Sequence, residues 1–181
     1  ALPGARGDGV PITTLIDLAS GTRILHYFAG KSDITLLLAS SSGYGFTTKV
    51  GDMVGRMKAG KAFMTLEESE EPLTPTVVSE EASAIACLSE KGRLLVFGLS
   101  EMKHLANGGR GVILMDIEAK EELIATAAIN QRGVKVIGAN KSGKPQEAHL
   151  SAGSLALHIG KRARKGKSLE TRMKATALLK V

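Results

Sequence analysis

Glycine-containing turns recur at a fixed interval along this chain, and the repeat restricts the folds open to it. Gly9, Gly60 and Gly111 each precede an apolar run, and neighbouring members of this set lie 51 residues apart. Gly166 follows 55 residues later. A period of about 20–50 residues is typical of propellers, solenoids and other arrays in which each unit packs on its neighbours. The sequence therefore predicts one domain over 1–181, with units near 7–57, 58–108, 109–160 and a partial unit over 161–181.

Each unit contains about four short apolar runs with partial period-2 alternation, bounded by Gly, Pro, Ser or Asp. Short runs of this kind indicate β-strands, and four strands per unit of about 50 residues are typical of a propeller-like array. We predict an all-β fold of about three to four four-stranded blades. The predicted strands are 12–18, 23–28, 34–39 and 44–50; 61–66, 76–78, 84–88 and 93–97; and 112–117, 123–129, 134–137 and 155–159.

Three other segments differ from the regular repeat. An insertion near 138–149 displaces the third copy of the repeat, and its first part, 138–145, is rich in turn residues. The stretches 100–105 and 168–174 are predicted as short helical turns.

Cys87 lies inside the apolar run 84–88, which predicts a buried, unreactive thiol. A single cysteine also excludes a disulfide framework within the chain.

Positive charge is unevenly distributed. The net charge is +6, yet residues 161–181 hold eight Lys and Arg against Glu170 alone, while residues 62–90 hold seven Glu and no Lys or Arg. Such asymmetry indicates a polyanion bound along part of the surface. Aromatic residues make up only 3% of the chain, which argues against stacking of single-stranded bases.

Basic residues accompany the repeated glycines. Arg6 precedes Gly7, Lys58 and Lys61 flank Gly60, and Arg110 lies beside Gly111. Glycine lets the backbone take positive φ and approach another backbone closely, and a turn of this kind offers N–H donors together with a cation to phosphate oxygens. The repeat predicts cations at equivalent points of successive blades.

Four motifs carry a family resemblance, and it extends over nearly the whole chain. Residues 2–9, 42–46, 56–62 and 158–162 are similar in order and spacing to the C-terminal domain of the A subunit of bacterial DNA topoisomerase IV. The resemblance implies a β-pinwheel, a propeller-like fold whose neighbouring blades exchange strands, and a role in binding and bending duplex DNA. It also implies two partners in a heterotetramer, the remainder of the A subunit together with the ATPase B subunit, in the bacterial cytoplasm at the nucleoid.

The related C-terminal domain of the gyrase A subunit is the alternative within this resemblance. Gyrase carries a box of Gln, Arg and Gly residues that supports tight DNA wrapping. Its nearest equivalents in this chain are 107–111 and 5–9, and both depart from that pattern, with the negative Asp8 inside one of them. The resemblance therefore favours topoisomerase IV over gyrase.

Residues suited to catalysis do not cluster in the sequence. His26, His104, His149 and His158 lack metal-ligand spacing. The DNA-cleaving tyrosine of the family belongs to the N-terminal part of its protein, so neither Tyr in this chain is assigned to that role. Four glutamates, Glu67, Glu68, Glu70 and Glu71, are interpreted as a solvated acidic loop. We expect no cofactor, no metal and no catalysis by this chain alone, within a larger ATP-dependent type II topoisomerase.

The sequence leaves two function classes open. The first is a non-catalytic module that binds duplex DNA through phosphates, without base readout, and positions segments for decatenation or relaxation. The second is a propeller-like scaffold for protein interaction, which would use an apolar face and need no basic rim. No apolar run approaches the length of a membrane span, and the start at Ala1 leads us to expect a piece of a longer protein. The predicted DNA-binding residues are Arg6, Lys49, Arg56, Lys58, Lys61, Arg93, Arg110, Lys161, Arg162, Arg164, Lys165 and Lys167.

Overall fold

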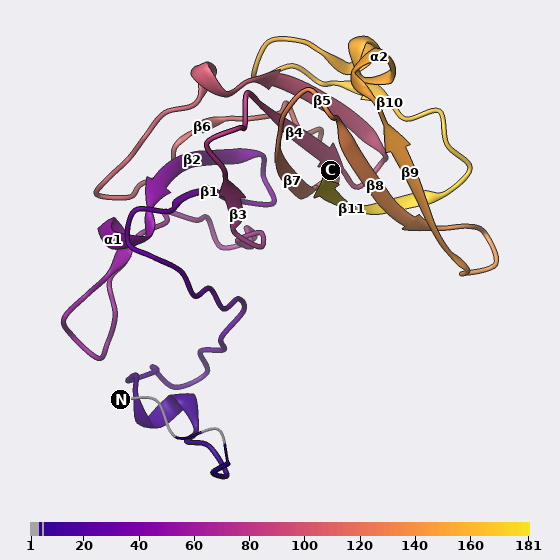
Figure 1. Ribbon diagram of the computed structural model, residues 1–181. Helices are drawn as coiled ribbons and strands as arrows, with labels where there is room; N and C mark the ends of the chain where they lie inside the picture. The colour runs from indigo at the N-terminus through magenta and orange to yellow at the C-terminus, as the bar shows by residue number, and fades with distance from the viewer. Residues whose placement is uncertain (1–3, 5) are drawn as a thin grey trace.

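Three antiparallel sheets follow one another along an arc in the computed structural model, which describes residue 4 and residues 6–181 (Figure 1). The sheet orders are β3–β1–β2–β6, β10–β5–β4–β7 and β11–β8–β9. This architecture confirms the predicted all-β, propeller-like fold. The strands are β1 (Thr35–Ala39), β2 (Tyr44–Lys49), β3 (Thr76–Val78), β4 (Ala84–Ser89), β5 (Arg93–Gly98), β6 (Val112–Ile113), β7 (Leu123–Ile129), β8 (Val134–Ala139), β9 (Pro145–Leu150), β10 (Lys167–Ser168) and β11 (Lys174–Lys180).

Each sheet is built on a hairpin and completed by strands from later in the chain. The hairpins are β1–β2, β4–β5 and β8–β9. On the concave side of the arc, β3, β7 and β11 pair with β1, β4 and β8 respectively. On the other side, β6 pairs with β2 and β10 pairs with β5. Neighbouring blades therefore exchange strands, as the pinwheel resemblance implied.

The apolar core lies between neighbouring sheets. Ile85 and Cys87 of β4 pack toward residues of β1, whereas Ala86 and Leu88 pack toward residues of β8. Successive side chains of a strand point to opposite faces, so a strand that is covered on both faces reads as a continuous apolar run. Cys87 is fully buried, as predicted, and this burial raises the pKa of its thiol.

The predicted strands at 12–18, 23–28 and 61–66 are wrong. Residues 12–14 form the short helix η1 (Ile12–Thr14), 23–28 form no strand, and within 61–66 only Met64 makes a single bridge. Strands require partners for their backbone groups, and in this fold the partner is the hairpin of an earlier unit. Residues 61–66 begin 51 positions before β6, which pairs with β2 and not with the hairpin directly before it. The corresponding partner of 61–66, like that of the two earlier runs, would be a hairpin before β1, and the described chain holds none there. These runs therefore have strand-like apolar residues without a ladder.

The predictions for the last third of the chain also need correction. Residues 155–159, predicted as a strand, belong mostly to α2 (Ala152–Leu155) and η3 (Ala156–His158). Leu155 and His158 are both buried and three residues apart, which is helical spacing. Within the insertion, a turn is followed by the strand β9, whose exposed polar residues concealed it. Its first residue is proline, which an edge strand tolerates at that position.

The remaining differences concern element type and length. The stretch 168–174 contains no helix, because β10 ends at Ser168 and β11 begins at Lys174. Of 100–105, only the first residues belong to a helix, the 3-10 turn η2 (Leu99–Glu101). The predicted strand 112–117 is shortened to β6. A further short helix, α1 (Val50–Met53), follows β2 directly.

Candidate nucleic-acid interface

Each of the first two blades has a segment from later in the chain along its outer edge. The N–H of Thr47 in β2 donates to the carbonyl of Lys103 at 2.9 Å, and the chain continues from there into β6. In the second blade, the N–H of Gly160 donates to the backbone of β5 at 2.8 Å before β10 pairs with the same strand. The basic stretch 161–167 is therefore folded onto the second blade, not left as a free tail.

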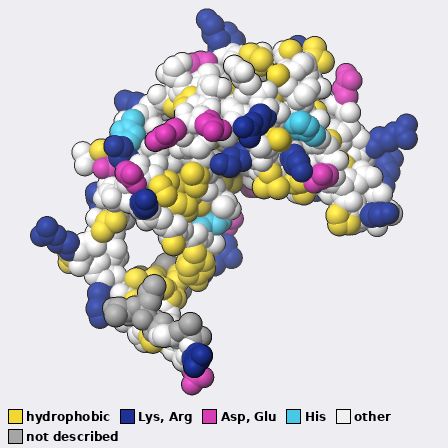
Figure 2. All heavy atoms as spheres, in the orientation of Figure 1, with side chains coloured by type: hydrophobic (Ala, Val, Ile, Leu, Met, Phe, Trp, Pro, Cys, Tyr) yellow, Lys and Arg dark blue, Asp and Glu magenta, His cyan; other side chains and the backbone are white. Residues whose placement is uncertain are grey.

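Figure 2 shows hydrophobic side chains gathered on the concave side of the arc, with further apolar areas along the upper convex outline. Lys and Arg side chains project from the convex outline and also lie, together with Asp and Glu side chains, across the face in view. A hollow of about 440 Å³ on the concave side is lined by residues of β3, β7 and β11 and the segment leading into β3. The convex outline therefore offers cations to a polyanion.

The repeated glycines have the backbone conformation that their spacing predicted. Gly9, Gly60, Gly111 and Gly166 have φ of +76°, +78°, +84° and +69°. A Cβ on Gly111 would lie 2.1 Å from the carbonyl oxygen of Gly45, and one on Gly166 would lie 2.6 Å from a carbonyl oxygen of β5. These two glycines thus allow the outer-edge segments to approach the sheets, whereas Gly9 and Gly60 face open space.

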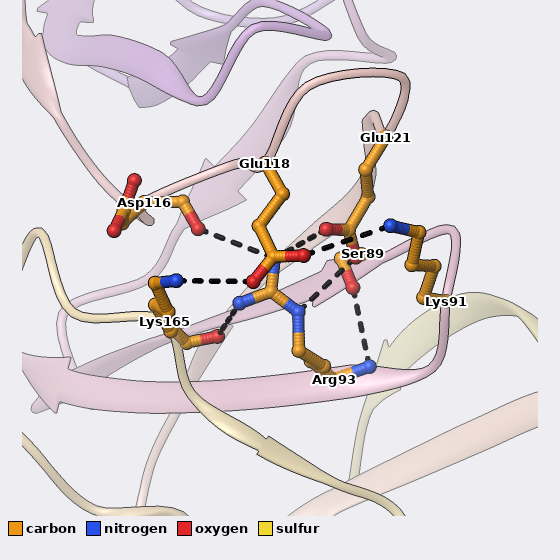
Figure 3. A network of polar contacts seen from close by, with 7 residues as sticks. All are labelled: Ser89, Lys91, Arg93, Asp116, Glu118, Glu121 and Lys165. Atoms are coloured by element: carbon orange, nitrogen blue, oxygen red, sulfur yellow. Dashed lines mark hydrogen bonds and ion pairs between the residues drawn. The ribbon is translucent and has the colours of Figure 1, made fainter.

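Arg93 joins three segments at the edge of the second blade (Figure 3). Its guanidinium forms an ion pair with Glu121, which includes an Nε hydrogen bond of 3.1 Å, and donates to the carbonyls of Lys165 and Asp116. The Arg93 and Glu121 side chains are 12% and 0% exposed. The charge of Arg93 is thereby neutralised within the fold, and the residue clamps β5 to two later segments.

The carboxylates of this network have lowered pKa values. Burial by itself would raise the pKa of Glu121, but hydrogen bonds from Arg93 and Ser89 and the positive charge of Arg93 lower it to about 2. The exposed Glu118 accepts a hydrogen bond from Lys165 at 3.1 Å and lies 3.7 Å from Lys91. The Lys165 hydrogen bond and these charges lower the pKa of Glu118. Both carboxylates are therefore ionised at neutral pH and form ion pairs with the nearby cations.

Arg110 has a similar internal role at the first blade. It pairs with Glu67 and, at 2.6 Å, with Glu70, while its guanidinium carbon lies 4.3 Å from the centre of the Tyr44 ring. The Glu70 side chain is only 5% exposed. The interpretation of the glutamates as a solvated loop is therefore wrong for Glu70, because a cation 40 residues away brings it into the fold.

The other predicted residues divide into two groups. In the first group, oxygens of the protein hold the charged group: Arg162 donates to the carbonyls of Glu101, at 3.1 Å, and Ile113, Lys61 donates to the carbonyl of Asp52 at 3.0 Å, and Lys165 pairs with Glu118. The second group consists of exposed cations that have no acidic side chain within 4 Å in the described part of the chain. They are Arg6, Lys49, Arg56, Lys58, Lys161, Arg164 and Lys167.

Sequence reasoning left out other cations that the fold exposes, and five of them lie at the outer edge of the first blade or together in the third blade. Lys103 lies in the outer-edge segment beside β2, and Lys141, Lys144, Arg172 and Lys174 come together at the far end of the third blade. The first of these is isolated in sequence from other basic residues. The others lie in two segments about 30 residues apart, and only the pairing of β8 with β9 and β11 brings them together.

The described residues hold no group of three or more His, Cys, Asp or Glu side chains that could bind a metal ion. Of the two tyrosines, Tyr27 is 74% exposed and Tyr44 lies beneath Arg110. In residue 4 and residues 6–181, helices are all too short to cross a membrane.

Comparison with known sequences gives one family and a consistent set of relatives. The family described as "DNA gyrase C-terminal domain, beta-propeller" matches residues 35–74 and 84–130. The A subunit of DNA topoisomerase 4 from Neisseria gonorrhoeae is 36% identical over 174 residues, covering 93% of this chain and 22% of the relative. The Escherichia coli K12 protein of the same name is 32% identical over 161 residues, with coverages of 89% and 19%. The chain thus spans about a fifth of the length of these relatives.

Solved structures agree with the sequence relatives. The C-terminal domain of Escherichia coli ParC superimposes with a TM-score of 0.84 at 28% identity, covering 98% of this chain and 73% of that structure. A DNA gyrase A C-terminal domain gives a TM-score of 0.72 at 20% identity, with coverages of 94% and 57%. The second likeness concerns the fold alone.

Proposed function

From the premise that this chain belongs to the DNA gyrase C-terminal domain family, which includes the C-terminal domain of the topoisomerase IV A subunit, we propose that it binds and bends duplex DNA without reading its sequence. The observation that carries the proposal is the row of exposed cations without acidic partners on the outer edges of successive blades. Lys49 lies at the end of β2, and Lys161 and Lys167 lie along β5. Cations of this kind bind phosphate oxygens and carry no base specificity.

The internal roles of Arg93 and Arg110 narrow the proposed contact set. Their guanidinium groups are committed to Glu121 in one case and to Glu67 and Glu70 in the other. We assign them to the fold, and we assign phosphate contact to the cations that lack acidic partners. These are Arg6, Lys49, Arg56, Lys58, Lys161, Arg164 and Lys167, while Lys61, Arg162 and Lys165, whose charged groups are held by oxygens of the protein, contribute long-range attraction.

The arc supports bending as well as binding. Cations that follow a curved edge make all their contacts only if the duplex curves with them. Bending a site of 20–30 base pairs by 40–90° costs about 1–6 kcal/mol, so several phosphate contacts are needed to offset it. The proposed cations, which lie in two neighbouring blades and the segment before them, can supply several such phosphate contacts.

In the intact enzyme, this chain would present DNA segments to the catalytic parts of a type II topoisomerase, which lie outside it. The proposed partners are the remainder of the topoisomerase IV A subunit and the ATPase B subunit, in the bacterial cytoplasm at the nucleoid. This proposal is supported by the share of the relatives that the chain matches, which is about a fifth of the length of the topoisomerase 4 A subunits. We expect the chain alone neither to cleave nor to relax a supercoiled plasmid, with or without ATP and Mg²⁺.

The test is a fluorescence-anisotropy titration of a random-sequence duplex at increasing salt. With about 5–8 phosphate contacts, the slope of log K against log[salt] should be about −4 to −7. A variant with Lys49→Gln, Lys161→Gln and Lys167→Gln should flatten the slope by about 3, because each contact contributes about 0.9. Energy transfer between dyes at the two duplex ends should rise on binding if the duplex bends.

A slope shallower than about −2, or a strong consensus sequence in a selection, would contradict phosphate-led binding. Absence of duplex binding would favour the protein-interaction scaffold, for which the apolar hollow beside β3, β7 and β11 is the surface to test. Strong constraint of supercoils in one sense on a relaxed plasmid would instead favour gyrase-type wrapping.

A further inference from the structure

The turns within the three hairpins differ in the charge of the segment packed against them. In the first two blades that segment is rich in glutamate. The N–H of Ser41 donates to the carbonyl of Glu71 at 2.9 Å, and the N–H of Glu90 donates to the carbonyl of Glu122 at 2.8 Å. These linkers, 67–71 and 116–122, place acidic side chains beside the turns. Negative charge at these positions opposes the approach of a phosphate backbone.

At the third blade the same position is basic. The linker before β11 contains Arg172, and Lys174 pairs in register with Ala139 at the end of β8. The adjoining β8–β9 turn, residues 140–144, adds Lys141 and Lys144. No acidic side chain of the described residues lies within 4 Å of these four cations.

The one acidic residue of this last linker serves a separate surface. Glu170 lines a hollow shared with Leu157 and His158, between β9, the helical segment and β10. It does not line the hollow at the β8–β9 turn. The third turn therefore lacks the acidic neighbours that its two counterparts have.

The β8–β9 turn holds its lysines on a constrained backbone. The side-chain oxygen of Asn140 accepts hydrogen bonds from the N–H groups of Ser142 and Lys144, both at 3.0 Å, and from the Ser142 hydroxyl at 2.7 Å. Gly143 takes φ of +78°, which closes the turn. The turn and the linker border an open hollow of about 770 Å³, lined by Asn140, Lys141, Ser142, Gln146, Thr171 and Arg172.

We infer that Lys141, Lys144, Arg172 and Lys174, the third-turn cluster, bind the phosphate backbone of duplex DNA where it leaves the outer edge of the second blade. This inference rests on the proposed DNA-binding function and adds a contact region to it. The lysines supply mobile point charges, and Arg172 supplies a planar fork that can bind two phosphate oxygens. Hydroxyl and amide groups of the same hollow supply further donors to phosphate.

The first measurement compares two charge-matched variants of the full chain. Lys141→Gln with Lys144→Gln should flatten the salt slope for a random-sequence duplex by about 2 relative to the wild type. The control, Lys31→Gln with Lys180→Gln, removes the same charge from exposed residues outside both proposed contact sets and should leave the slope unchanged. All three proteins are first compared by circular dichroism and thermal unfolding.

The second measurement locates the DNA without relying on affinity. A thiol-reactive photocrosslinker on Lys144→Cys should attach to duplex DNA upon illumination, and the same probe on Lys180→Cys should not. Cys87 does not compete for the label, because it is fully buried and its burial raises the thiol pKa.

The outcomes separate this inference from the proposed function. A wild-type chain that binds no duplex refutes the DNA-binding function and the inference with it. A wild-type chain that binds duplex, while the cluster variant keeps the wild-type slope or the two probes crosslink equally, overturns the inference alone. A flattened slope together with crosslinking at position 144 alone establishes it.

Discussion

The second and third hairpin turns occupy equivalent places in successive blades but use their cations differently. At the second turn, Arg93 is buried against Glu121, and Lys91 pairs with Glu118 (Figure 3). At the third turn, Lys141 and Lys144 are exposed and have no acidic neighbour within 4 Å among the described residues. A basic residue beside one of these two turns is thus left without an acidic partner only where the adjoining linker lacks carboxylates.

The largest expected effect comes from breaking the buried pair of the second turn. Arg93→Ala leaves Glu121 buried without its partner and removes the link between β5 and two later segments. Removal of one member of a buried ion pair costs about 3–5 kcal/mol. Lys144→Ala at the third turn should change the free energy of unfolding by less than about 0.5 kcal/mol. Urea denaturation followed by circular dichroism measures both.

A double variant provides the control for this prediction. Arg93→Leu with Glu121→Leu removes both charges and should be more stable than Arg93→Ala, because no uncompensated charge stays buried. Equal stabilities of Arg93→Ala and Lys144→Ala would show that the two turns do not differ in the way described.

Acid should weaken the second turn selectively. The pKa of Glu121 is about 2 in the fold, against an ordinary value of 4.5. Because the unfolded chain binds the proton more tightly, the contribution of Glu121 to stability is fully present above about pH 4.5 and is lost as the pH falls through about 2. The free energy of unfolding should therefore drop more between pH 5 and pH 3 in the wild type than in Glu121→Gln.

The third blade supplies a matched control. Glu147→Gln removes an exposed carboxylate that lies 3.5 Å from Lys135, so this variant should keep the wild-type dependence on pH. Parallel stability curves for the wild type and Glu121→Gln would contradict the assignment of the low pKa to the buried pair.

The smallest expected effect would make the second turn resemble the third. Glu118→Gln frees Lys91 and Lys165 from their shared carboxylate. If the duplex passes near this turn, the slope of log K against log[salt] should steepen by about 1–2. Glu147→Gln serves again as the control, since it removes the same charge at a distance from the turn. A Glu118→Gln slope equal to that of Glu147→Gln would place the DNA away from the second turn.

Local patterns in the sequence were sufficient for the fold class and for much of the repeat. The apolar runs at 76–78, 84–88, 93–97 and 123–129 are strands in the structure, and the four spaced glycines all have positive φ. The order of short motifs also identified the family. These features depend on neighbouring residues, because strand alternation and turn geometry are set within a few positions of the chain.

Only the tertiary structure decided which apolar runs become strands and which cations stay free. The run 61–66 resembles a strand as much as 76–78 does, but its ladder partner would be a hairpin that the described chain does not hold before β1. Arg93 and Lys144 both lie near turn glycines, yet only the charge of Arg93 is neutralised, by a carboxylate 28 residues away in the sequence. Pairing and neutralisation depend on groups far apart in sequence, and chain folding alone brings those groups within hydrogen-bonding distance.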